Sequence, residues 1–443
     1  MRKRIENKVL RSNRWGGPGS SVRRSRRRAE PTLSATGGRS PPEFKGEREV
    51  STPFEPVGGP GGGAAVAPPR IQMKILQVVS CRGWSSDAYW ATRMCSELDR
   101  TGHEATLVCR RGTEERVISR ARAEGVKRIE TLSLRSGLRP WADLDDIRSL
   151  RARLESVDIV HVHRGKEHWL AALANRLRAR PTPLVRTRHI VQPLQPHALN
   201  RWLYGHATDL MITVSEAIAR QCRAAGLVSA HRVIALPGGA DGERFQPASD
   251  STALRRRLGI DEKAVVIGVL SGFRVMKGHG LVVEAATRLA SGRRPFHLVF
   301  AGQGPFEAAI RQAVEKAGLS ERVSFLGFVQ DTAGLLAALD IALYPPLESD
   351  GMSRALFEYL AAGRAVVASR VGVAAEVLTD GRDALLVPGG DAPELAAAMA
   401  RLLERPTLRA ELGQAAARLA HGRLTGARVA ERLVDHYRGL LAG

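Results

Sequence analysis

The sequence has few cysteines and no long hydrophobic runs. Only four of its 443 residues are cysteine, and no pair has the Cys-x-x-Cys spacing, which argues against a disulfide framework or a zinc site. A reducing cytosol is therefore the expected compartment. The longest apolar stretches are broken by polar residues, as Asp340 breaks 334–347, and none approaches the roughly 18–20 apolar residues that span a bilayer. These absences exclude an integral membrane protein.

The remaining composition is that of a soluble globular protein with a basic excess. Hydrophobic residues make up 44% and charged residues 25% of the chain, and 67 Lys and Arg against 45 Asp and Glu give a net charge of +22. Wholesale disorder and a fibrous repeat are excluded. At roughly 150 residues per domain, the length predicts two or three domains.

The first 72 residues differ from the rest. They hold 15 Lys and Arg, 6 Glu and no Asp, together with 11 Gly and 9 Pro. Such a segment cannot bury enough apolar surface to offset its ordering entropy, so residues 1–72 are predicted to be a disordered basic tail. The cationic run 23–28 could serve as a nucleic-acid-binding arm. Because it lacks interleaved aromatic residues, nucleic acid is not the expected partner.

From Met73 onward, short β-branched runs alternate with amphipathic helical stretches, which is typical of a parallel sheet covered by helices. A Gly- and Pro-rich stretch at 236–247 separates two such series. We therefore expect an α/β fold with two Rossmann-like, doubly wound domains that face each other across a cleft. The expected boundaries are 73–240, 241–415 and a C-terminal helical segment, 416–443, that crosses back to the first domain. Ligands of such sheets bind at the carboxyl ends of the strands.

The loop 271–278 places two cations after the first strand of the second domain. Arg274 and Lys277 lie between a strand end and a helix start, where fixed positive charge and free backbone N–H groups make a phosphate site. A solvated basic loop is the alternative interpretation, because loops are commonly charged.

The next strand is followed by a glycine-rich turn. Gly302 and Gly304 superficially resemble the dinucleotide-binding fingerprint, but Pro305 intrudes and Glu307 replaces the third small residue. An NAD-dependent oxidoreductase is therefore disfavoured. The two glycines are predicted to form a tight strand-to-helix connection that lines the cleft.

A third loop-to-helix segment, 348–363, contains acidic residues on both sides of a helix start. Asp350 lies on the loop, and Gly351 permits a sharp entry into the helix. The first helical N–H groups, those of Met352, Ser353 and Arg354, can hold a diphosphate. Glu358 lies about two turns into the helix and is either a solvated surface acid or a ligand contact.

This segment resembles the signature of the retaining nucleotide-sugar glycosyltransferases of family 4, which have the GT-B fold. In that signature, two glutamates separated by seven residues lie in a Glu-Gly-Phe/Met…Leu-Glu-Ala-Met-Ala-x-Gly frame. Nearly all of residues 73–443 can be laid along the family. Further matching segments are 101–104, 214–217, 237–241 with Phe245, 323–327, Gly372 with Glu376, and 380–388.

The resemblance implies roles for individual residues of the donor site. Arg274 and Lys277 would bind the donor diphosphate and stabilise the leaving nucleotide, and Glu358 would hydrogen-bond the ribose hydroxyls. Asp350 occupies the place of the first glutamate, which contacts the donor sugar. It is one methylene shorter than the usual residue, and Glu348 could compensate.

His189 matches the family's histidine at the first-domain lip of the donor pocket, where it would contact the sugar or the acceptor. A hydrogen-bonded structural histidine is the alternative. His161 and His163 lie on one face of the strand 158–163, but no Cys or acidic partner accompanies them. Because three or four ligands are normally needed, no metal and no other cofactor are expected.

Acceptor recognition is expected from the first domain. The candidate residues follow the strands at 74–80 and 158–163 and are Arg82, Gly83, Trp84, Arg164 and Lys166. The arginine-rich stretches 110–128 and 148–153 add a cationic face that suits an anionic surface, although a compositional bias toward arginine explains them equally well.

Taken with these features, the family resemblance implies a glycosyltransferase of the hexosyltransferase type, and the resemblance alone implies retention of the anomeric configuration. Such an enzyme would move a sugar from a nucleoside-diphosphate sugar to a glycan or lipid-linked acceptor, in lipopolysaccharide or another cell-surface polysaccharide. The expected location is the cytoplasm, with peripheral binding to the inner face of the membrane. The competing hypothesis is a catalytically inactive GT-B protein that binds a nucleotide or a partner, which the Asp350 substitution and the single glycine of the first loop suggest.

Overall fold

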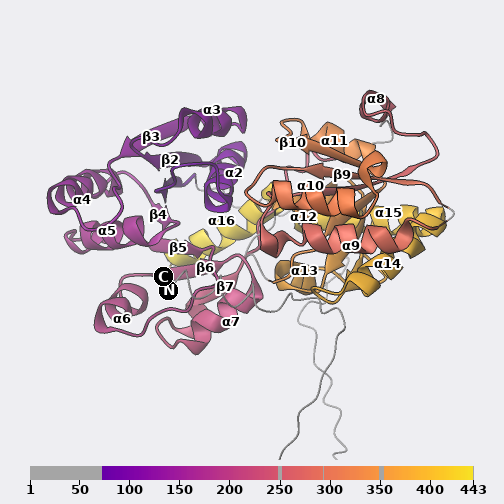
Figure 1. Ribbon diagram of the computed structural model, residues 1–443. Helices are drawn as coiled ribbons and strands as arrows, with labels where there is room; N and C mark the ends of the chain where they lie inside the picture. The colour runs from indigo at the N-terminus through magenta and orange to yellow at the C-terminus, as the bar shows by residue number, and fades with distance from the viewer. Residues whose placement is uncertain (1–71, 248–251, 293, 349–353, 443) are drawn as a thin grey trace, which may run out of the picture. The chain divides into compact units, whose positions relative to one another are not determined.

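The computed structural model describes residues 72–247, 252–292, 294–348 and 354–442, all within one compact unit that spans 68–443. These residues form two parallel β-sheets, each flanked by helices (Figure 1). The backbone polar groups of each strand are paired with neighbouring strands. The apolar side chains of the central strands are covered on both faces, as is typical of parallel sheets.

The first sheet has seven strands in the order β3-β2-β1-β4-β5-β6-β7. The central strand β1 pairs in parallel with both β2 and β4, so the chain reverses its winding direction between β1 and β4. The strands are β1 (Lys74–Val79), β2 (Glu104–Arg110), β3 (Arg128–Leu132), β4 (Ile159–Val162), β5 (Leu184–Arg188), β6 (Leu210–Thr213) and β7 (Val233–Ala235). Their helices are α2 (Ser86–Arg100), α3 (Glu115–Ala123), α4 (Pro140–Leu154), α5 (Gly165–Arg176), α6 (Ala198–Gly205) and α7 (Glu216–Ala224).

The second sheet has six strands in the order β10-β9-β8-β11-β12-β13, and its winding reverses between β8 and β11. The strands are β8 (Val265–Leu270), β9 (Phe296–Ala301), β10 (Val323–Gly327), β11 (Ile341–Tyr344), β12 (Ala365–Ser369) and β13 (Leu385–Val387). The helices are α8 (Thr252–Arg257), α9 (His279–Leu289), α10 (Glu307–Lys316), α11 (Thr332–Ala338), α12 (Arg354–Ala361), α13 (Gly372–Val377) and α14 (Ala392–Glu404). Three short 3₁₀ turns, η1 (Ala230–Arg232), η2 (Val275–Lys277) and η3 (Ser320–Arg322), complete the described connections.

Both sheets have the strand order of the doubly wound Rossmann arrangement, so the predicted fold class is confirmed. The elements α3, β3, α4, α6, β7 and α8 were not predicted from the sequence. The edge strand β3 reads Arg-Ile-Glu-Thr-Leu and is mostly half-buried or exposed, so it lacks the apolar run by which the buried strands were recognised. The helix α3 is rich in arginine and buries only Val117 and Ala121.

The last helices connect the second sheet back to the first. α15 (Pro406–Arg423) packs on α12 and β12, and the expected crossing segment 416–443 therefore begins inside α15. The crossing itself lies at Leu424 to Gly426, where Thr425 forms an isolated parallel bridge with Ala240. Beyond it, α16 (Gly426–Ala442) packs on α2 and extends beside the first sheet (Figure 1).

Candidate active site

The two points at which the sheets reverse their winding carry most of the predicted site residues. Loops after β8 and β11 diverge at the reversal in the second sheet, and loops after β1 and β4 diverge at the reversal in the first. Ligands of doubly wound sheets bind at such points, because the diverging loops leave a crevice at the carboxyl ends of the strands.

The loops after β8 and β11 are held together by a close backbone approach at Gly278. This residue has φ of 73°, and a Cβ atom placed on it would lie 1.9 Å from the carbonyl oxygen of Pro345. A further contact joins the same loops, since the N–H of Leu347 donates to the carbonyl of Met276 at 2.9 Å. Only glycine fits at position 278, and it fixes the position of the adjacent Lys277.

The predicted glycine turn after β9 packs against the loop after β8 in the same way. A Cβ atom on Gly302, where φ is 149°, would lie 2.0 Å from the carbonyl oxygen of Ser271. A Cβ on Gly304 would lie 2.4 Å from that of Phe273. The sequence prediction of a tight connection is consistent with this geometry, and the close backbone packing accounts for both glycines.

A cleft of about 1510 Å³ opens beside these loops. It is lined by residues of both sheets' connections: α2 and α3 on one side, and the loops after β8, β9 and β11 with the start of α12 on the other. Of the predicted site residues, the cleft brings together Trp84, Lys277, Gly302, Arg354 and Glu358. Its basic lining residues are Arg100, Arg116, Arg120, Arg244, Lys277 and Arg354.

Glu358 is a buried acid at the wall of the cleft. Its side chain is 5% exposed, and its Oε1 lies 2.9 Å from Nε of Arg354, one turn earlier on α12. Burial raises the pKa of the Glu358 carboxyl, and the adjacent Arg354 guanidinium partly offsets that rise. Of the two interpretations of Glu358 from the sequence, the solvated surface acid is thus excluded by its burial.

The Arg354 side chain also reaches toward the first sheet's helices. Its guanidinium carbon lies 5.2 Å from the ring centroid of Tyr89 on α2, a cation–π contact. Nearby, the Arg120 guanidinium covers the Trp84 ring at 4.7 Å, and Trp84 packs edge-to-face on Tyr89 at 6.3 Å. These four side chains form a continuous row in which the two aromatic rings lie between the two arginines.

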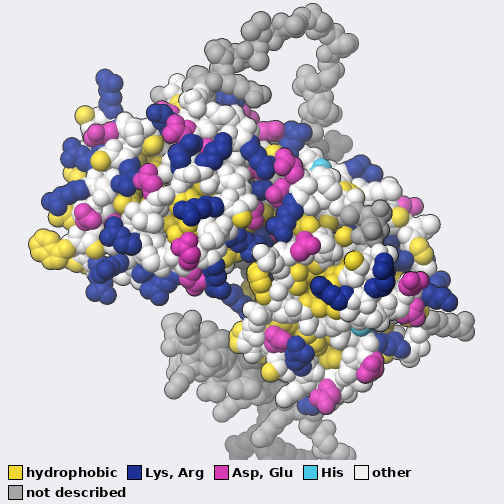
Figure 2. Space-filling model, turned by 90° about the horizontal axis from the view of Figure 1, so that it is seen from above, with side chains coloured by type: hydrophobic (Ala, Val, Ile, Leu, Met, Phe, Trp, Pro, Cys, Tyr) yellow, Lys and Arg dark blue, Asp and Glu magenta, His cyan; other side chains and the backbone are white. Residues whose placement is uncertain are grey.

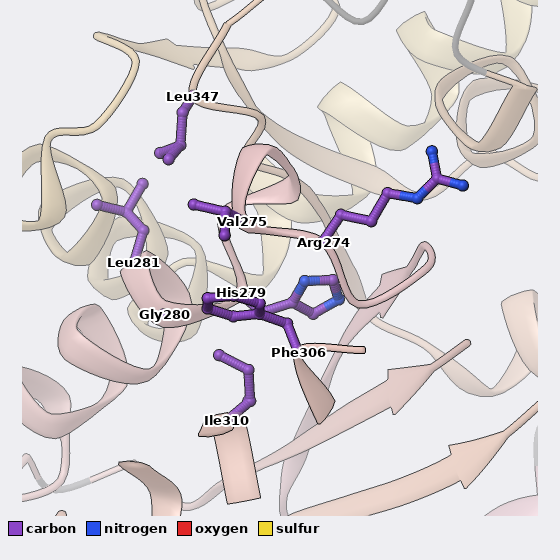
Figure 3. A pocket seen from close by; sticks show the side chains of 9 residues that line it. Arg274, Val275, His279, Gly280, Leu281, Phe306, Ile310 and Leu347 are labelled. Atoms are coloured by element: carbon purple, nitrogen blue, oxygen red, sulfur yellow. The ribbon is translucent and has the colours of Figure 1, made fainter. Parts of the chain in front are cut away.

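Arg274 and Lys277, the two predicted diphosphate ligands, lie in different surroundings. Lys277 is half-buried and lines the large cleft. Arg274 is exposed and borders a separate, mainly apolar pocket of about 150 Å³, and Figure 3 shows its guanidinium extending away from Leu281 and Leu347. His279 at the same pocket stacks on Phe273, and burial lowers its pKa to about 4.

Four of the predicted donor-site residues lie outside the described residues. They are Asp350, Gly351, Met352 and Ser353. Their predicted contacts with the diphosphate and the donor sugar therefore remain predictions. The described part of the helix begins at Arg354.

His189 follows β5 and lies in a cluster of histidines; it is not among the residues that line the cleft. Its Nε2 lies 3.2 Å from Nδ1 of His163, and its ring packs edge-to-face on Trp90 at 6.1 Å. Burial lowers the pKa of His189 to about 3, so the ring is neutral near pH 7. The predicted contact of His189 with a substrate remains a prediction.

The predicted acceptor residues lie at the reversal in the first sheet, but two of their charged side chains, Arg164 and Lys166, are paired with carboxylates of the same half of the protein. Nε of Arg164 donates to Asp87, and Nζ of Lys166 donates to Asp143 at 2.5 Å. Arg82 is exposed, whereas Gly83 is half-buried beside the Glu114 carboxylate. Their role in acceptor binding stays a prediction.

Several cleft residues were not anticipated from the sequence. Tyr89 and Arg120 lie on α2 and α3, and Arg244 and Phe328 lie on loops of the second half. Tyr89 sits among the apolar residues of an amphipathic helix, a pattern that marks core positions. The spacing of these residues along the chain gave no signal, because they meet only when the two sheets' loops are brought together.

The arginine-rich stretches of the first half are partly neutralised. Arg128 lies 2.6 Å from Asp99, Arg153 lies 2.7 Å from Glu130, and Arg116 pairs with Glu114. Figure 2 shows basic and acidic side chains interspersed over the visible face. Among the described residues, none of the helices has the length and apolarity needed to cross a bilayer.

Two parallel, doubly wound sheets, with a cleft lined by the loops at the carboxyl ends of their strands, define an α/β protein of the GT-B type. Comparison with known proteins defines the family more closely. Residues 263–405 match the family model of glycosyl transferases group 1, and residues 88–244 match that of glycosyltransferase family 4. The chain belongs to this family of glycosyltransferases.

Two relatives illustrate the range of the family. The chain is 30% identical over 286 residues to 2-deoxystreptamine glucosyltransferase of Streptomyces kanamyceticus, a match that covers 60% of this chain and 73% of that protein. It is also 30% identical over 222 residues to the lipopolysaccharide core biosynthesis mannosyltransferase LpsB of Rhizobium meliloti, over 48% of this chain and 63% of that protein.

A solved structure supports the fold. The crystal structure of Anabaena HepE in complex with UDP-glucose matches with a TM-score of 0.69 at 20% identity, covering 83% of this chain and all of that chain. At this identity the likeness establishes the fold, and the predicted GT-B architecture is confirmed.

Proposed function

We propose that the protein transfers a hexosyl group from a nucleoside-diphosphate sugar to a hydroxyl of a glycan or glycolipid, with retention of the anomeric configuration. The observation that carries this proposal is the cleft at the reversal between β8 and β11, which joins Lys277 to the buried Glu358. A fixed cation for a diphosphate and a carboxylate for hydroxyl groups are the contacts that a nucleotide sugar requires.

The diphosphate would bind between Lys277, Arg274 and the backbone N–H groups of residues 352–354. Negative charge grows on the leaving nucleotide in the transition state, and these donors would stabilise it. In this proposal the charge is neutralised by fixed side chains and needs no bound metal or other cofactor. Gly302 and Gly304 would let the backbone approach the nucleotide closely, and Asp350 would accept hydrogen bonds from the donor sugar.

Glu358 would accept hydrogen bonds from the ribose hydroxyls. Its burial and its ion pair with Arg354 fix the carboxylate orientation before the ligand binds. A preorganised acceptor loses little entropy on binding. This role needs the ionised form of Glu358, which Arg354 favours.

Retention is proposed through a same-face reaction. Retaining glycosidases use two carboxyl groups about 5–5.5 Å apart, one of them as a nucleophile. Here the leaving phosphate would instead assist by accepting the proton of the incoming hydroxyl on the same face of the sugar. The family resemblance supports this course, and identifying the product anomer by NMR tests it.

The acceptor would bind at the loops of the first sheet, near Arg82, Gly83, Trp84, Arg164 and Lys166. The relative LpsB is a lipopolysaccharide core mannosyltransferase by name, which supports a lipid-linked or cell-surface polysaccharide acceptor. A cytoplasmic enzyme that binds peripherally to the inner membrane face would meet such an acceptor. Closure of the cleft would exclude water from the reactive donor.

The first experiment is thermal unfolding of the protein against UDP-, GDP- and ADP-sugars. A ligand at 100 times its Kd adds about 2.7 kcal/mol, which raises Tm by several degrees. A selective shift identifies the donor, and Lys277→Ala and Glu358→Gln should each reduce it. No shift with any donor for the folded protein would contradict the proposal and favour the inactive alternative.

Donor turnover provides the second test. The selected nucleotide sugar is incubated with candidate acceptors, with and without EDTA, and release of the nucleoside diphosphate is measured. Turnover that survives EDTA supports charge neutralisation by Arg274 and Lys277. Turnover that depends on an added divalent cation contradicts that part of the proposal.

A further inference from the structure

A chain of hydrogen-bonded side chains runs through the first sheet and ends at His189. It begins at Tyr437 on α16, whose Oη lies 2.6 Å from Nδ1 of His161 and 3.4 Å from Nε2 of Gln77. The other end of the Gln77 amide continues the chain, because Oε1 lies 2.7 Å from Nε2 of His163. Nδ1 of His163 then lies 3.2 Å from Nε2 of His189.

The hydrogen-bonded side chains between Tyr437 and His163 are buried and tightly packed. Gln77 and His161 are fully buried and His163 is 2% exposed, and the two histidine rings stack at 4.8 Å. Trp90 packs against His161, His163 and His189 with centroid distances of 5.3, 5.4 and 6.1 Å. In such surroundings each hydrogen atom has a defined place, since an unsatisfied polar group costs free energy.

The orientation of the Gln77 amide determines which group donates and which accepts in the hydrogen bonds that lead to His189. The amide N–H₂ group faces Tyr437 and His161, so Oε1 faces His163. Because Oε1 can only accept, Nε2 of His163 must carry a hydrogen. Burial keeps the His163 ring neutral, and its Nδ1 is therefore a bare acceptor.

The same reasoning determines which ring nitrogen of His189 carries the hydrogen. Nε2 of His189 must donate to the bare Nδ1 of His163, which leaves Nδ1 of the neutral His189 ring as a lone pair. That Nδ1 is a buried atom without a hydrogen-bond partner among the described residues, although the His189 residue as a whole is half-buried. Within this cluster, both ring nitrogens of His161 and of His163 have partners.

We propose that Gln77 and His163 are positioning residues that hold His189 in the Nε2–H tautomer, so that its Nδ1 accepts a hydrogen bond from a substrate hydroxyl. The inference rests on the proposed function for its substrate, but the tautomer is a property of the protein alone. The neighbouring charges that face His189 are those of Asp87, Arg164 and Arg186. The Arg164–Asp87 pair holds two of these charges together.

The tautomer is tested directly by NMR on the full chain with ¹⁵N-labelled histidine. The His189 signals are those that disappear in His189→Gln. We expect a protonated Nε2 and an unprotonated Nδ1 at pH 7. A protonated Nδ1 would mean that the hydrogen bonds between Tyr437 and His189 run in the opposite direction. That result would overturn the proposal whether or not the protein shows transferase activity.

The positioning role is tested by turnover of the nucleotide sugar selected in the thermal experiment. His163→Leu removes the acceptor for the His189 N–H, whereas His163→Asn retains an oxygen acceptor near the position of Nδ1. We expect His163→Leu to lower kcat by about 10- to 100-fold with little change in donor KM, as is typical when an orienting partner is lost. We expect His163→Asn to keep most of the wild-type kcat. Gln77→Met should also lower kcat and should yield a mixture of His189 tautomers.

The matched control is His168→Asn. His168 is also buried in the first half and bonds Thr208 at 2.8 Å, but it lies outside the chain of hydrogen bonds. Its turnover should equal that of the wild type at equal folded fraction. Equal losses in His163→Leu and His163→Asn would show a packing role and overturn the positioning role. Absence of turnover in the wild type with every donor would instead contradict the proposed function, while the NMR result would still decide the tautomer.

Discussion

Nε of Arg354 lies 2.9 Å from Oε1 of Glu358, and both side chains line the cleft. The arginine does more than neutralise the carboxylate, because its guanidinium also covers the Tyr89 ring of the opposite wall. The pair thus connects the proposed ribose contact to a helix of the first sheet.

Replacing Arg354 by Met should change the pH dependence of nucleotide binding. Burial raises the pKa of Glu358 and Arg354 counteracts the rise, so the variant should have a still higher pKa. Binding that needs the carboxylate weakens as the pH falls through this pKa, and the loss should begin at a higher pH in the variant. Calorimetric titration of the selected nucleotide between pH 5 and 8 measures the shift.

The control for this experiment is Arg288→Met. Arg288 forms the same kind of pair, with Glu284 one turn earlier on α9 at 3.1 Å, but both side chains are more than half exposed. Its pH profile of binding should match the wild type. If Arg354→Met also matched the wild type, Glu358 would not be the group that titrates in nucleotide binding.

Replacing Gly278 by Ala should disrupt the site more than its backbone angle alone explains. The new Cβ would meet the Pro345 carbonyl at 1.9 Å, so the loops after β8 and β11 must separate. Gly318 has a similar φ of 68° with no atom within 4 Å of a Cβ, and it provides the control. Gly318→Ala should cost about 1–2 kcal/mol from the left-handed conformation, whereas Gly278→Ala should cost more and should weaken nucleotide binding. Urea unfolding measures the loss of stability, and the nucleotide-induced shift in Tm measures the loss of binding. Equal effects of the two variants on both quantities would contradict the prediction.

Replacing Glu376 by Gln should destabilise the contact between α13 and α7. The Glu376 carboxylate accepts hydrogen bonds from the backbone N–H groups of Glu216 and Ala217 at 2.6 and 2.7 Å, at the start of α7. An amide can accept at only one atom and loses the favourable charge at the helix start, so we expect a loss of about 1 kcal/mol in unfolding free energy. Urea denaturation measures it, and Glu404→Gln, at an exposed position that ends α14, is the control. A Glu376→Gln variant as stable as this control would show that the cap contributes nothing.

Unfolding free energy should fall as the pH drops from about 6.5 toward 5. Burial lowers the pKa of His189 to about 3 and that of His279 to about 4, and it lowers those of His161, His163 and His168 well below the ordinary value. The unfolded chain therefore binds protons in this range that the folded chain does not. Each such group contributes a slope of at most about 1.4 kcal/mol per pH unit.

Urea unfolding at half-unit steps of pH measures that slope. Buried carboxyl groups with a raised pKa, such as Glu167 and Glu358, take up protons first in the folded chain and oppose this slope, so the contribution of one histidine is obtained from the difference between its variant and the wild type. His168→Asn removes one of these histidines and should reduce the slope of unfolding free energy against pH by the contribution of that one group. An unchanged slope in that variant would mean that His168 is protonated equally in the folded and unfolded chains.

The sequence was sufficient for the fold class because each buried strand carries a recognisable apolar run, such as Lys-Ile-Leu-Gln-Val-Val in β1. The loops that follow those strands could also be identified, and the structure brings Lys277, Gly302 and Glu358 to one cleft. The domain boundaries and the roles of the site residues stay predictions. Elements without such runs, notably β3 and α3, were not recognised.

Contacts between distant segments were beyond the sequence analysis for a physical reason. Arg164 and Lys166 follow a strand end and carry charge, which indicated ligand binding, but their partners Asp87 and Asp143 lie far away in the chain. Whether a cation meets a ligand or an internal carboxylate depends on tertiary packing. The burial of Glu358 also depends on tertiary packing, which its position in the sequence does not show.

The position of α16 has a consequence for how the protein is made. The side chains of Val429, Leu433 and Tyr437 are buried in the same hydrophobic core as β1, α2 and β4, which are synthesised first. The N-terminal half therefore leaves the ribosome with part of its apolar surface uncovered, and it can complete its core only after the last 17-residue helix is released. The N-terminal half can therefore complete its fold only after α16 has been translated. A stop codon before α16 would leave the apolar surface of α2 exposed, which promotes aggregation.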